Sequence, residues 1–114
     1  MEVNSNIPQL VAVGLTEDQA SLYDALLRKG TLTARKATLE AGVPRTLGYA
    51  VLKQLENKGL VTKTELPGAV AQFSAAHPGV LLDKAESEQK AAERALSNLK
   101  IALPDLSSLY NLAT

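Results

Sequence analysis

The 114-residue sequence has no cysteine, a single histidine and no long run of apolar residues. Without cysteine the chain has no disulfides, no thiolate metal ligands and no cysteine nucleophile. The one histidine, His77, stands before a proline, and a lone imidazole is a poor basis for a metal site. No apolar run approaches the roughly 20 residues that cross a bilayer, and residues 1–10 lack the basic start and apolar core of a secretory leader. We therefore expect a cytoplasmic protein with no metal ion, no other cofactor and no membrane partner.

Signatures of catalysis are missing as well. The sequence has no glycine-rich loop that could cradle phosphates. The acids of residues 83–93 alternate with lysine and arginine, which is typical of the solvated surface of a helix rather than of a pair of catalytic carboxylates. We therefore expect that the protein is not an enzyme.

The net charge is zero, because 12 basic residues balance 12 acidic ones, but the charges are unevenly distributed. Residues 1–27 carry a charge of −4, residues 28–63 carry +6, and residues 64–114 carry −2. A basic segment of this kind suggests that one face of the molecule meets a polyanion. Chance clustering of charge on solvated helices is the alternative.

The first strongly periodic segment, residues 15–29, is expected to form a helix. Thr16 can cap its N-terminus, acids occupy the first turn, and Arg28 and Lys29 stand in the last turn before Gly30. The helical spacing of its apolar residues indicates a buried stripe. That stripe consists of Ala20, Tyr23, Leu26 and Leu27.

Two further helices are expected, over residues 34–41 and 44–58. Thr33 can cap the first, Gly42 separates the two, and Pro44 suits the first turn of the second because its missing N–H would be unpaired there anyway. In the first of these helices, the side chains of Ala37 and of either Leu39 or Ala41 are expected to face the core.

After Gly59 the apolar period changes from helical to alternating. Residues 60–66 read as a strand, the proline and glycine at 67 and 68 mark a turn, and residues 69–75 are a plausible return strand. Three helices followed by a hairpin, with a tight link between the second and third helices, is the layout of a winged helix-turn-helix.

A long helix is expected from Pro78 to residue 103. Its apolar positions recur at alternating spacings of three and four residues, which is the heptad pattern of a coiled coil. This seam can pair with a second chain or fold back onto the first helix of its own domain, and we favour a homodimer because so long a helix would overhang a small domain. Pro104 should kink or end the helix, leaving residues 105–110 as a short final turn. The seam residues are Leu82, Ala85, Gln89, Ala92, Leu96, Leu99, Leu103 and Leu106.

These elements define the expected fold class, which is α+β but mainly α. A winged helix-turn-helix of three helices and a β-hairpin is followed by a long C-terminal coiled-coil helix. We expect the winged domain to occupy residues 1–76, and the dimerisation helix with its short C-terminal turn to occupy residues 77–114.

With these elements in place, the chain resembles the N-terminal DNA-binding domain of the TrmB family of archaeal transcription regulators. The likeness lies in “GLTEDQASLYDALLRKG” at 14–30, “ARKATLEAGVPRTLGYAVLKQLENKGLV” at 34–61, the hairpin ending in Phe73, and “HPGVLLDKAESEQ” at 77–89. The family pattern of a helix-opening proline, a tyrosine, two leucines and “KGLV” is matched by Pro44, Tyr49, Leu52, Leu55 and residues 58–61.

The resemblance implies that the start of the helix over residues 44–58 enters the major groove of DNA. Arg45 suits a guanine edge, since one guanidinium can bond O6 and N7 together. Thr46 suits a phosphate or a base, Tyr49 can offer its hydroxyl to a phosphate, and Lys53 suits the phosphate backbone. The alternative is a solvated side chain at each position, or a purely structural role for Tyr49.

Arg35 and Lys36 open the preceding helix, where backbone amides and side-chain charge can together hold a phosphate. The wing, residues 64–72, lacks the arginines or lysines that relatives often place at its tip, so we expect little phosphate contact from it. The candidate DNA-binding residues are therefore Arg35, Lys36, Arg45, Thr46, Tyr49 and Lys53.

Two positions depart from the family pattern. Leu47 stands where many relatives carry a polar residue, and Gly48 stands where they usually bury a branched apolar residue. Outward, Leu47 could touch a thymine methyl or a partner protein. We expect instead that Leu47 faces inward and compensates for the missing side chain of Gly48.

The function that we expect is that of a DNA-binding transcription regulator acting as a homodimer on double-stranded DNA. The alternative is a winged-helix adaptor that binds proteins and has no nucleic acid role, which the neutral wing and Leu47 would favour. Larger TrmB proteins continue into a sugar-sensing domain, whereas this chain ends soon after the long helix. We therefore do not expect a small-molecule effector.

Overall fold

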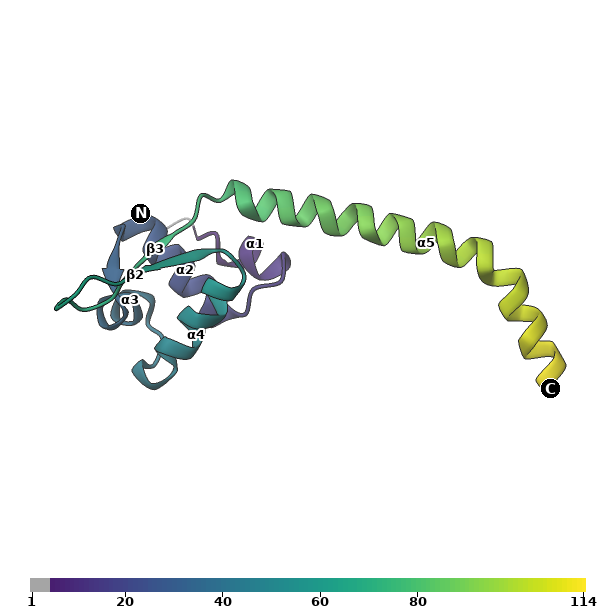
Figure 1. Ribbon diagram of the computed structural model, residues 1–114, viewed down its shortest axis with the longest axis horizontal. Helices are drawn as coiled ribbons and strands as arrows, with labels where there is room; N and C mark the ends of the chain where they lie inside the picture. Colours follow the sequence, from purple (N-terminus) through teal and green to yellow (C-terminus); the bar gives the residue numbers. More distant parts are fainter. Residues whose placement is uncertain (1–4) are drawn as a thin grey trace. The chain divides into compact units, whose positions relative to one another are not determined.

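The computed structural model of the chain describes residues 5–114, which form five helices and three strands (Figure 1). The contacts divide the chain after Leu81, so that the residues up to Leu81 make one compact unit and Leu82–Thr114 a second. The elements are α1 (Ile7–Ala12), α2 (Glu17–Lys29), β1 (Leu32–Thr33), α3 (Ala34–Ala41), α4 (Arg45–Asn57), β2 (Val61–Thr64), β3 (Gln72–Ala75) and α5 (Gly79–Ala113). The predicted fold class, mainly helical with a small sheet and a long C-terminal helix, is confirmed.

α2 begins and ends as the sequence predicts. The Thr16 hydroxyl accepts a hydrogen bond from the Gln19 backbone N–H, and the Gln19 side chain accepts one from the Thr16 N–H, both at 3.1 Å. This capping box satisfies two amides that the helix itself cannot pair. Gly30 then ends the helix at φ 82°, a backbone conformation that favours glycine.

The buried face of α2 is centred differently from the prediction. Ala20, Tyr23 and Leu26 are buried as expected, but Leu27 is 43% exposed. Leu22, which the predicted stripe omits, is fully buried. Because α1, α3, α4 and β3 all contact α2, its buried face is broader than one line of residues, and Leu27 falls at its edge.

α3 and α4 form the helix-turn-helix. Thr33 caps α3 by accepting a hydrogen bond from the Lys36 backbone N–H at 3.3 Å, and Gly42 ends the helix in the left-handed conformation. α4 begins at Arg45, one residue later than predicted, and Pro44 is the residue that precedes its first helical position. The α3 bounds agree with the prediction, and those of α4 differ by one residue at each end.

The inward face of α3 is made of small side chains. Ala34, Ala37 and Thr38 are buried, whereas Leu39 is 79% exposed. Of the two alternatives that the sequence left open, it is therefore Ala41, half-buried, that faces the core. Small residues let α3 lie close to its neighbours α2 and α4.

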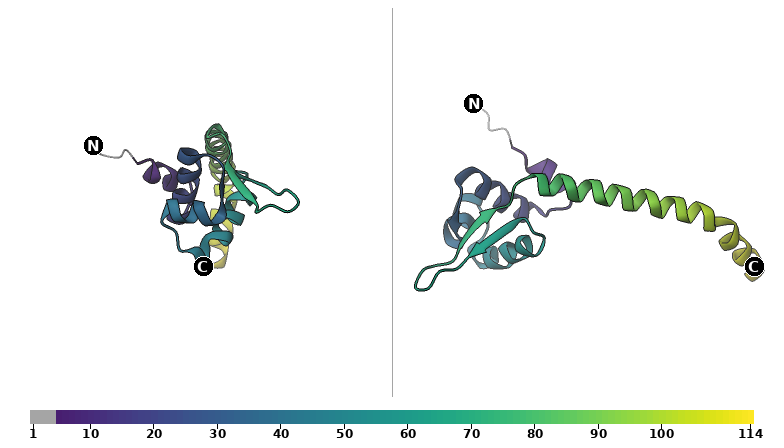
Figure 2. Two further views of the ribbon diagram at one scale, coloured as in Figure 1. Left: turned by 90° about the vertical axis from the view of Figure 1, so that its left-hand side faces the viewer. Right: turned by 45° about the horizontal axis from the view of Figure 1, so that its top comes forward.

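The sheet contains the predicted hairpin and one further strand. The strand order is β1-β3-β2 with antiparallel pairing throughout, and Leu32 lies opposite Phe73 while Val61 lies opposite Ala75. The sequence does not predict β1, because two residues are too few to show an alternating period. The loop between β2 and β3, residues 65–71, is the wing, and it projects beyond the helices in both views of Figure 2.

The first unit has one apolar core. α1, which the sequence did not predict, adds Leu10 to it through a six-residue helix that packs on α2. The Tyr23 hydroxyl donates to the Ala76 carbonyl oxygen at 2.8 Å, which fastens α2 to the segment leading into α5. Burial raises the pKa of the Tyr23 phenol. The fully buried large side chains are Leu22, Tyr23, Leu26, Leu52, Leu55 and Leu60.

The second unit is helical, and none of the described residues of α5 is buried. Of the two outcomes expected at Pro104, a kink or an end, the helix does not end but continues to Ala113, and residues 105–110 belong to it rather than forming a short separate turn. Proline costs the helix the hydrogen bond to the carbonyl four residues earlier, and the helix accommodates this by bending. Figure 1 shows α5 changing direction in its C-terminal part. Within the described part of the chain, no helix has the length and apolar character needed to span a membrane.

Candidate nucleic-acid interface

α4 presents one face to the core and the opposite face to solvent. Its buried residues are Gly48, Val51, Leu52 and Leu55. A hydrogen bond of 2.8 Å from the Gln19 side-chain amide to the Gln54 side-chain oxygen also holds the helix against α2. On the opposite side, an exposed line runs along the helix with spacings of four, three and four residues: Thr46, Ala50, Lys53 and Asn57.

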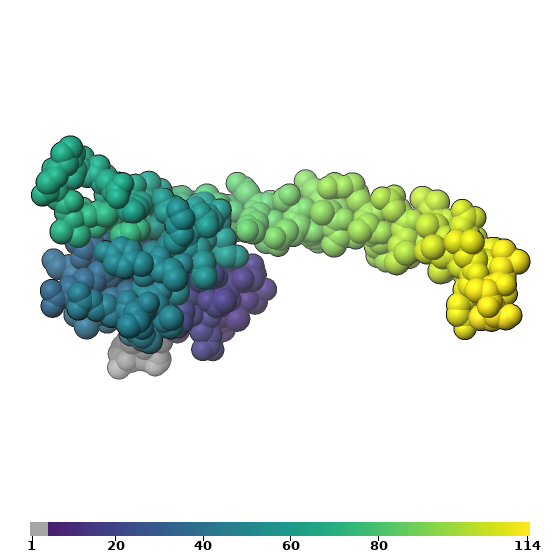
Figure 3. Space-filling model, turned by 60° about the horizontal axis from the view of Figure 1, so that its bottom comes forward, coloured from purple at the N-terminus to yellow at the C-terminus, as the bar shows by residue number. Residues whose placement is uncertain are grey.

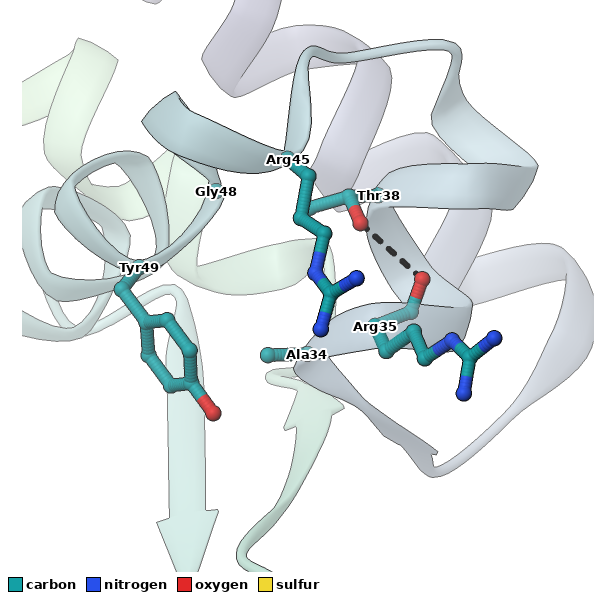
Figure 4. A pocket seen from close by; sticks show the side chains of 6 residues that line it. All are labelled: Ala34, Arg35, Thr38, Arg45, Gly48 and Tyr49. Atoms are coloured by element: carbon teal, nitrogen blue, oxygen red, sulfur yellow. Dashed lines mark hydrogen bonds between the residues drawn. The ribbon is translucent and has the colours of Figure 1, made fainter.

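A small hollow of about 50 Å³ lies where the start of α4 meets the start of α3 (Figure 4). Arg45, Tyr49 and Arg35 line it together with Ala34, Thr38 and Gly48. In Figure 4 the Arg45 side chain extends toward Ala34, with the Tyr49 ring on one side and Arg35 on the other. The Thr38 hydroxyl donates to the Arg35 carbonyl oxygen at 2.9 Å, so it is occupied within α3.

The closeness of α3 and α4 depends on Gly48. A Cβ added to Gly48 would overlap the Thr38 Cγ2 methyl group. The glycine is therefore a packing requirement, although glycine inside a helix costs roughly 0.5–1 kcal/mol relative to alanine. The expectation that Leu47 turns inward to compensate is wrong, because Leu47 is 46% exposed and Thr38 already fills the space beside Gly48.

The basic side chains of residues 28–63 are of two kinds, those that form an ion pair and those that do not. Three of its eight bases contact acids: Arg28 lies 2.8 Å from Asp24, Lys29 lies 3.9 Å from Glu40, and Lys63 lies 3.2 Å from Glu65. The remaining five have no ion pair among the described residues, and they are Arg35, Lys36, Arg45, Lys53 and Lys58. Within this segment, two of the five unpaired cations are on α3, two are on α4, and Lys58 directly follows α4.

All six candidate DNA-binding residues are exposed, and the structure places them in two groups. Arg35, Arg45 and Tyr49 share the small hollow, and Lys36 borders a larger one beside it. Thr46 and Lys53 lie on the outward line of α4 instead. Figure 3 shows α3 and α4, coloured blue to teal, at the surface of the first unit.

Sequence reasoning missed Ala50, which lies on the outward line between Thr46 and Lys53. Its spacing of four residues from Thr46 and three from Lys53 indicates that it lies on the same face, but an alanine has no polar or charged group that would suggest a contact. Its side chain is short, so the outward line is flat at this position.

The wing offers apolar side chains rather than charge. Leu66 is 64% exposed and Val70 is 67% exposed, and Glu65 neutralises Lys63 at the base of the loop. Lys63 is therefore less available for contact with a phosphate than the five unpaired cations.

No group of three or more histidine, cysteine, aspartate or glutamate residues that could hold a metal ion occurs in the part of the chain that the structure describes. The His77 Nδ1 atom accepts a hydrogen bond of 2.9 Å from the Gly79 backbone N–H. The histidine thus satisfies an amide at the start of α5.

A helix-turn-helix joined to an antiparallel hairpin wing, with a basic outer face, defines the winged helix-turn-helix class. Within that class, residues 10–78 match the family model described as “Sugar-specific transcriptional regulator TrmB”. The chain belongs to the TrmB family.

Individual relatives agree with this assignment. The chain is 32% identical over 78 residues to the sugar-sensing transcriptional regulator TrmBL1 of Pyrococcus furiosus, an alignment that covers 68% of this chain and 22% of that protein. The solved structure of TrmBL2, described as an archaeal chromatin protein with a novel mode of DNA binding, is 27% identical with a TM-score of 0.73. That match covers 96% of this chain and 42% of TrmBL2.

A possible transcriptional regulator from Methanosarcina mazei Go1 shares the fold at 15% identity with a TM-score of 0.62, over 79% of this chain and 81% of that one. The chain thus spans about a fifth of TrmBL1 and less than half of TrmBL2.

Proposed function

We propose that the chain is a DNA-binding transcription regulator that acts as a homodimer on double-stranded DNA. The observation that carries this proposal is the set of unpaired cations on α3 and α4, which stands on an exposed helix-turn-helix although the whole chain is neutral. Membership of a transcription-regulator family and the DNA binding stated for TrmBL2 support it.

In this proposal α4 enters the major groove with its outward line. Thr46 and Ala50 are short and allow close approach, and Lys53 reaches the phosphate backbone. Arg45, whose side chain extends along α3, holds a phosphate together with Arg35. The reading of a guanine edge by Arg45, which the sequence suggested, then requires its side chain to turn away from Ala34, and it stays a prediction.

Fluorescence anisotropy with a labelled duplex of random sequence tests the proposal. We expect a dissociation constant within the non-specific range of about 10⁻⁴–10⁻⁶ M and a steep fall of affinity with salt. Replacing Lys53 with alanine should flatten the slope of log affinity against log salt by about 0.9, the share of one phosphate contact. The matched control is Lys63→Ala, which removes the same charge from an ion pair with Glu65 and should change the slope less.

Absence of binding at about 100 μM protein and low salt would refute DNA binding. In that event the exposed Leu66 and Val70 of the wing would favour the alternative function, a protein-interaction adaptor. If Arg45→Ala relaxes sequence preference instead of lowering affinity evenly, its role is base reading rather than phosphate binding.

The homodimer part of the proposal rests on α5. Leucines of the heptad seam are exposed on a single chain, with Leu82, Leu96 and Leu99 at 59%, 54% and 56%. Because the helix passes Pro104 unbroken, the same spacing extends beyond Leu106 to Tyr110 and Ala113. The proposed interface residues are Leu82, Ala85, Gln89, Ala92, Leu96, Leu99 and Leu103.

Pairing of two such helices would give the dimer two α4 helices for major-groove faces about 34 Å apart on B-DNA. We also propose that the winged domain ends at residue 76 and that the dimerisation segment begins at residue 77. Light scattering at tens of micromolar tests the assembly, and a monomeric mass would contradict it.

A further inference from the structure

A larger hollow of about 580 Å³ adjoins the small one, between α3, the first turns of α4 and the wing. This volume lies within the range of roughly 300–1,000 Å³ that is usual for sites of small organic ligands. The two hollows share Ala34, Arg35, Arg45 and Tyr49, and Figure 4 shows this common part. All of these elements belong to the first unit, so the site is complete within one chain.

The lining of this hollow combines positive charge with apolar surface. Arg35, Lys36 and Arg45 are unpaired among the described residues, and the lining includes no acid. Leu39 and Val70, which are 79% and 67% exposed, also line it, as does the Tyr49 ring. Leucine and valine side chains do not improve the binding of a phosphate group, so DNA phosphate binding accounts for only part of this lining.

We propose that this hollow binds a small aromatic carboxylate, which competes with DNA for the same arginines. A guanidinium presents paired N–H donors that match the two oxygens of a carboxylate, and Arg45 or Arg35 supplies them. The aromatic body of the ligand lies against Tyr49, Val70 and Leu39, which removes apolar surface of both partners from water. Inorganic phosphate would satisfy the cations but would leave these three side chains exposed.

The binding of the carboxylate stands on the hollow alone, and only its effect on DNA rests on the function proposed above. One set of arginines cannot neutralise a ligand carboxylate and a DNA phosphate at the same time. Ligand at ten times its dissociation constant should therefore raise the apparent dissociation constant for DNA about 11-fold. This result would replace the expectation from the sequence that the chain has no small-molecule effector.

The direct test is a titration of the whole ¹⁵N-labelled chain with benzoate, followed by amide chemical shifts. We expect saturable shifts at residues 34–36, Arg45, Tyr49 and Val70, with a dissociation constant on the order of 1 mM for a ligand of this size. Benzamide, which has the same ring without the charge, should bind at least about tenfold more weakly, since it lacks the charge-assisted bonds.

Two variants examine the two halves of the site. Arg45→Gln removes a cation and Val70→Asp places an acid in the apolar half, and each should weaken benzoate at least about tenfold. Both residues are exposed, so neither change should disturb the core. Lys90→Gln removes the same unit of charge as Arg45→Gln from α5, and it should leave benzoate binding unchanged.

Shifts that spread over the surface without saturating by 20 mM (on the order of 20 times the dissociation constant expected from ligand size) would overturn the site, and so would normal benzoate binding by Arg45→Gln. DNA binding without benzoate binding would refute this inference and leave the proposed function standing. Benzoate binding without any DNA binding would refute the proposed function and leave the carboxylate site standing. The anisotropy measurements keep ionic strength constant with chloride, so that displacement of DNA reports competition rather than screening.

Discussion

The two units of the chain differ in the burial of their apolar side chains. In the first unit, Leu22, Leu52 and Leu55 are fully buried by other parts of the same unit. In α5, the leucines of the heptad seam are about half-exposed, and none of the helix's described residues is buried. The first unit thus contains its own core, whereas the described residues of α5 have none within this chain.

Because of this difference in burial, we expect the two units to be stabilised by different contacts. An isolated helix in water gains little from its own hydrogen bonds, and most helical stability in proteins comes from packing of an apolar face. In the proposed dimer, the second chain would supply this packing to the 35 residues of α5. Substitutions in α5 should act on assembly, and substitutions in the first unit should act on folding.

The largest effect is expected at a leucine in the C-terminal half of the seam. Leu99→Asn removes an apolar contact from both chains of the proposed dimer, at roughly 1.5–3 kcal/mol for each side chain. The dimer dissociation constant should rise by about 10²–10⁴-fold, measured by analytical ultracentrifugation. The control is Ile101→Asn on the same helix, which is 76% exposed and off the seam. Equal effects of the two changes would show that the seam is misassigned.

The next largest effect is expected in the core of the first unit. Leu52→Ala leaves a cavity beneath α4 and should lower the free energy of unfolding by about 2–5 kcal/mol. Urea denaturation monitored by tyrosine fluorescence, to which all three tyrosines contribute, measures this loss. Leu99→Ala makes the same chemical change on α5 and should leave the unfolding transition of the first unit in place. A shared transition for both variants would break the distinction between the units.

A smaller effect tests the contact between α3 and α4. Gly48→Ala forces the new methyl group against Thr38 Cγ2, and overpacking of this kind costs about 1–3 kcal/mol. Thr38→Ser deletes that methyl group while keeping the hydroxyl that donates to the Arg35 carbonyl oxygen. The double variant should therefore recover most of the lost stability in urea denaturation. Failure of this rescue would mean that Gly48 is needed for another reason.

Local sequence signals predict four of the five described helices and the hairpin, but not α1. Thr16, Thr33, Gly30 and Gly42 carry cap and stop chemistry that depends only on neighbouring residues, and the structure places them as expected. The candidate DNA contacts are exposed for a similarly local reason, since they lie off the buried faces of α3 and α4.

The features that the sequence does not predict depend on residues far apart in the chain. Gly48 is explained by Thr38 on another helix. The buried face of α2 depends on its contacts with α1, α3, α4 and β3, which leave Leu27 43% exposed. β1 exists because Leu32 meets Phe73, which is 41 positions away. Contacts of this type leave no periodic signal along the chain.

The smallest effect concerns the hydrogen bond between Tyr23 and Ala76, at the end of the first unit. Tyr23→Phe should cost about 1 kcal/mol near neutral pH, since the Ala76 carbonyl loses its donor. Burial raises the pKa of Tyr23 above its ordinary value of 10.0, so the unfolded chain loses this proton before the folded one does. The stabilisation by Tyr23 is thus fully present below pH 10 and declines as pH rises beyond it. Urea denaturation at pH 8 and pH 10.5 should show a smaller difference between the two proteins at the higher pH. A constant difference would mean that Tyr23 ionises equally in both states, and hence that the first unit opens around it.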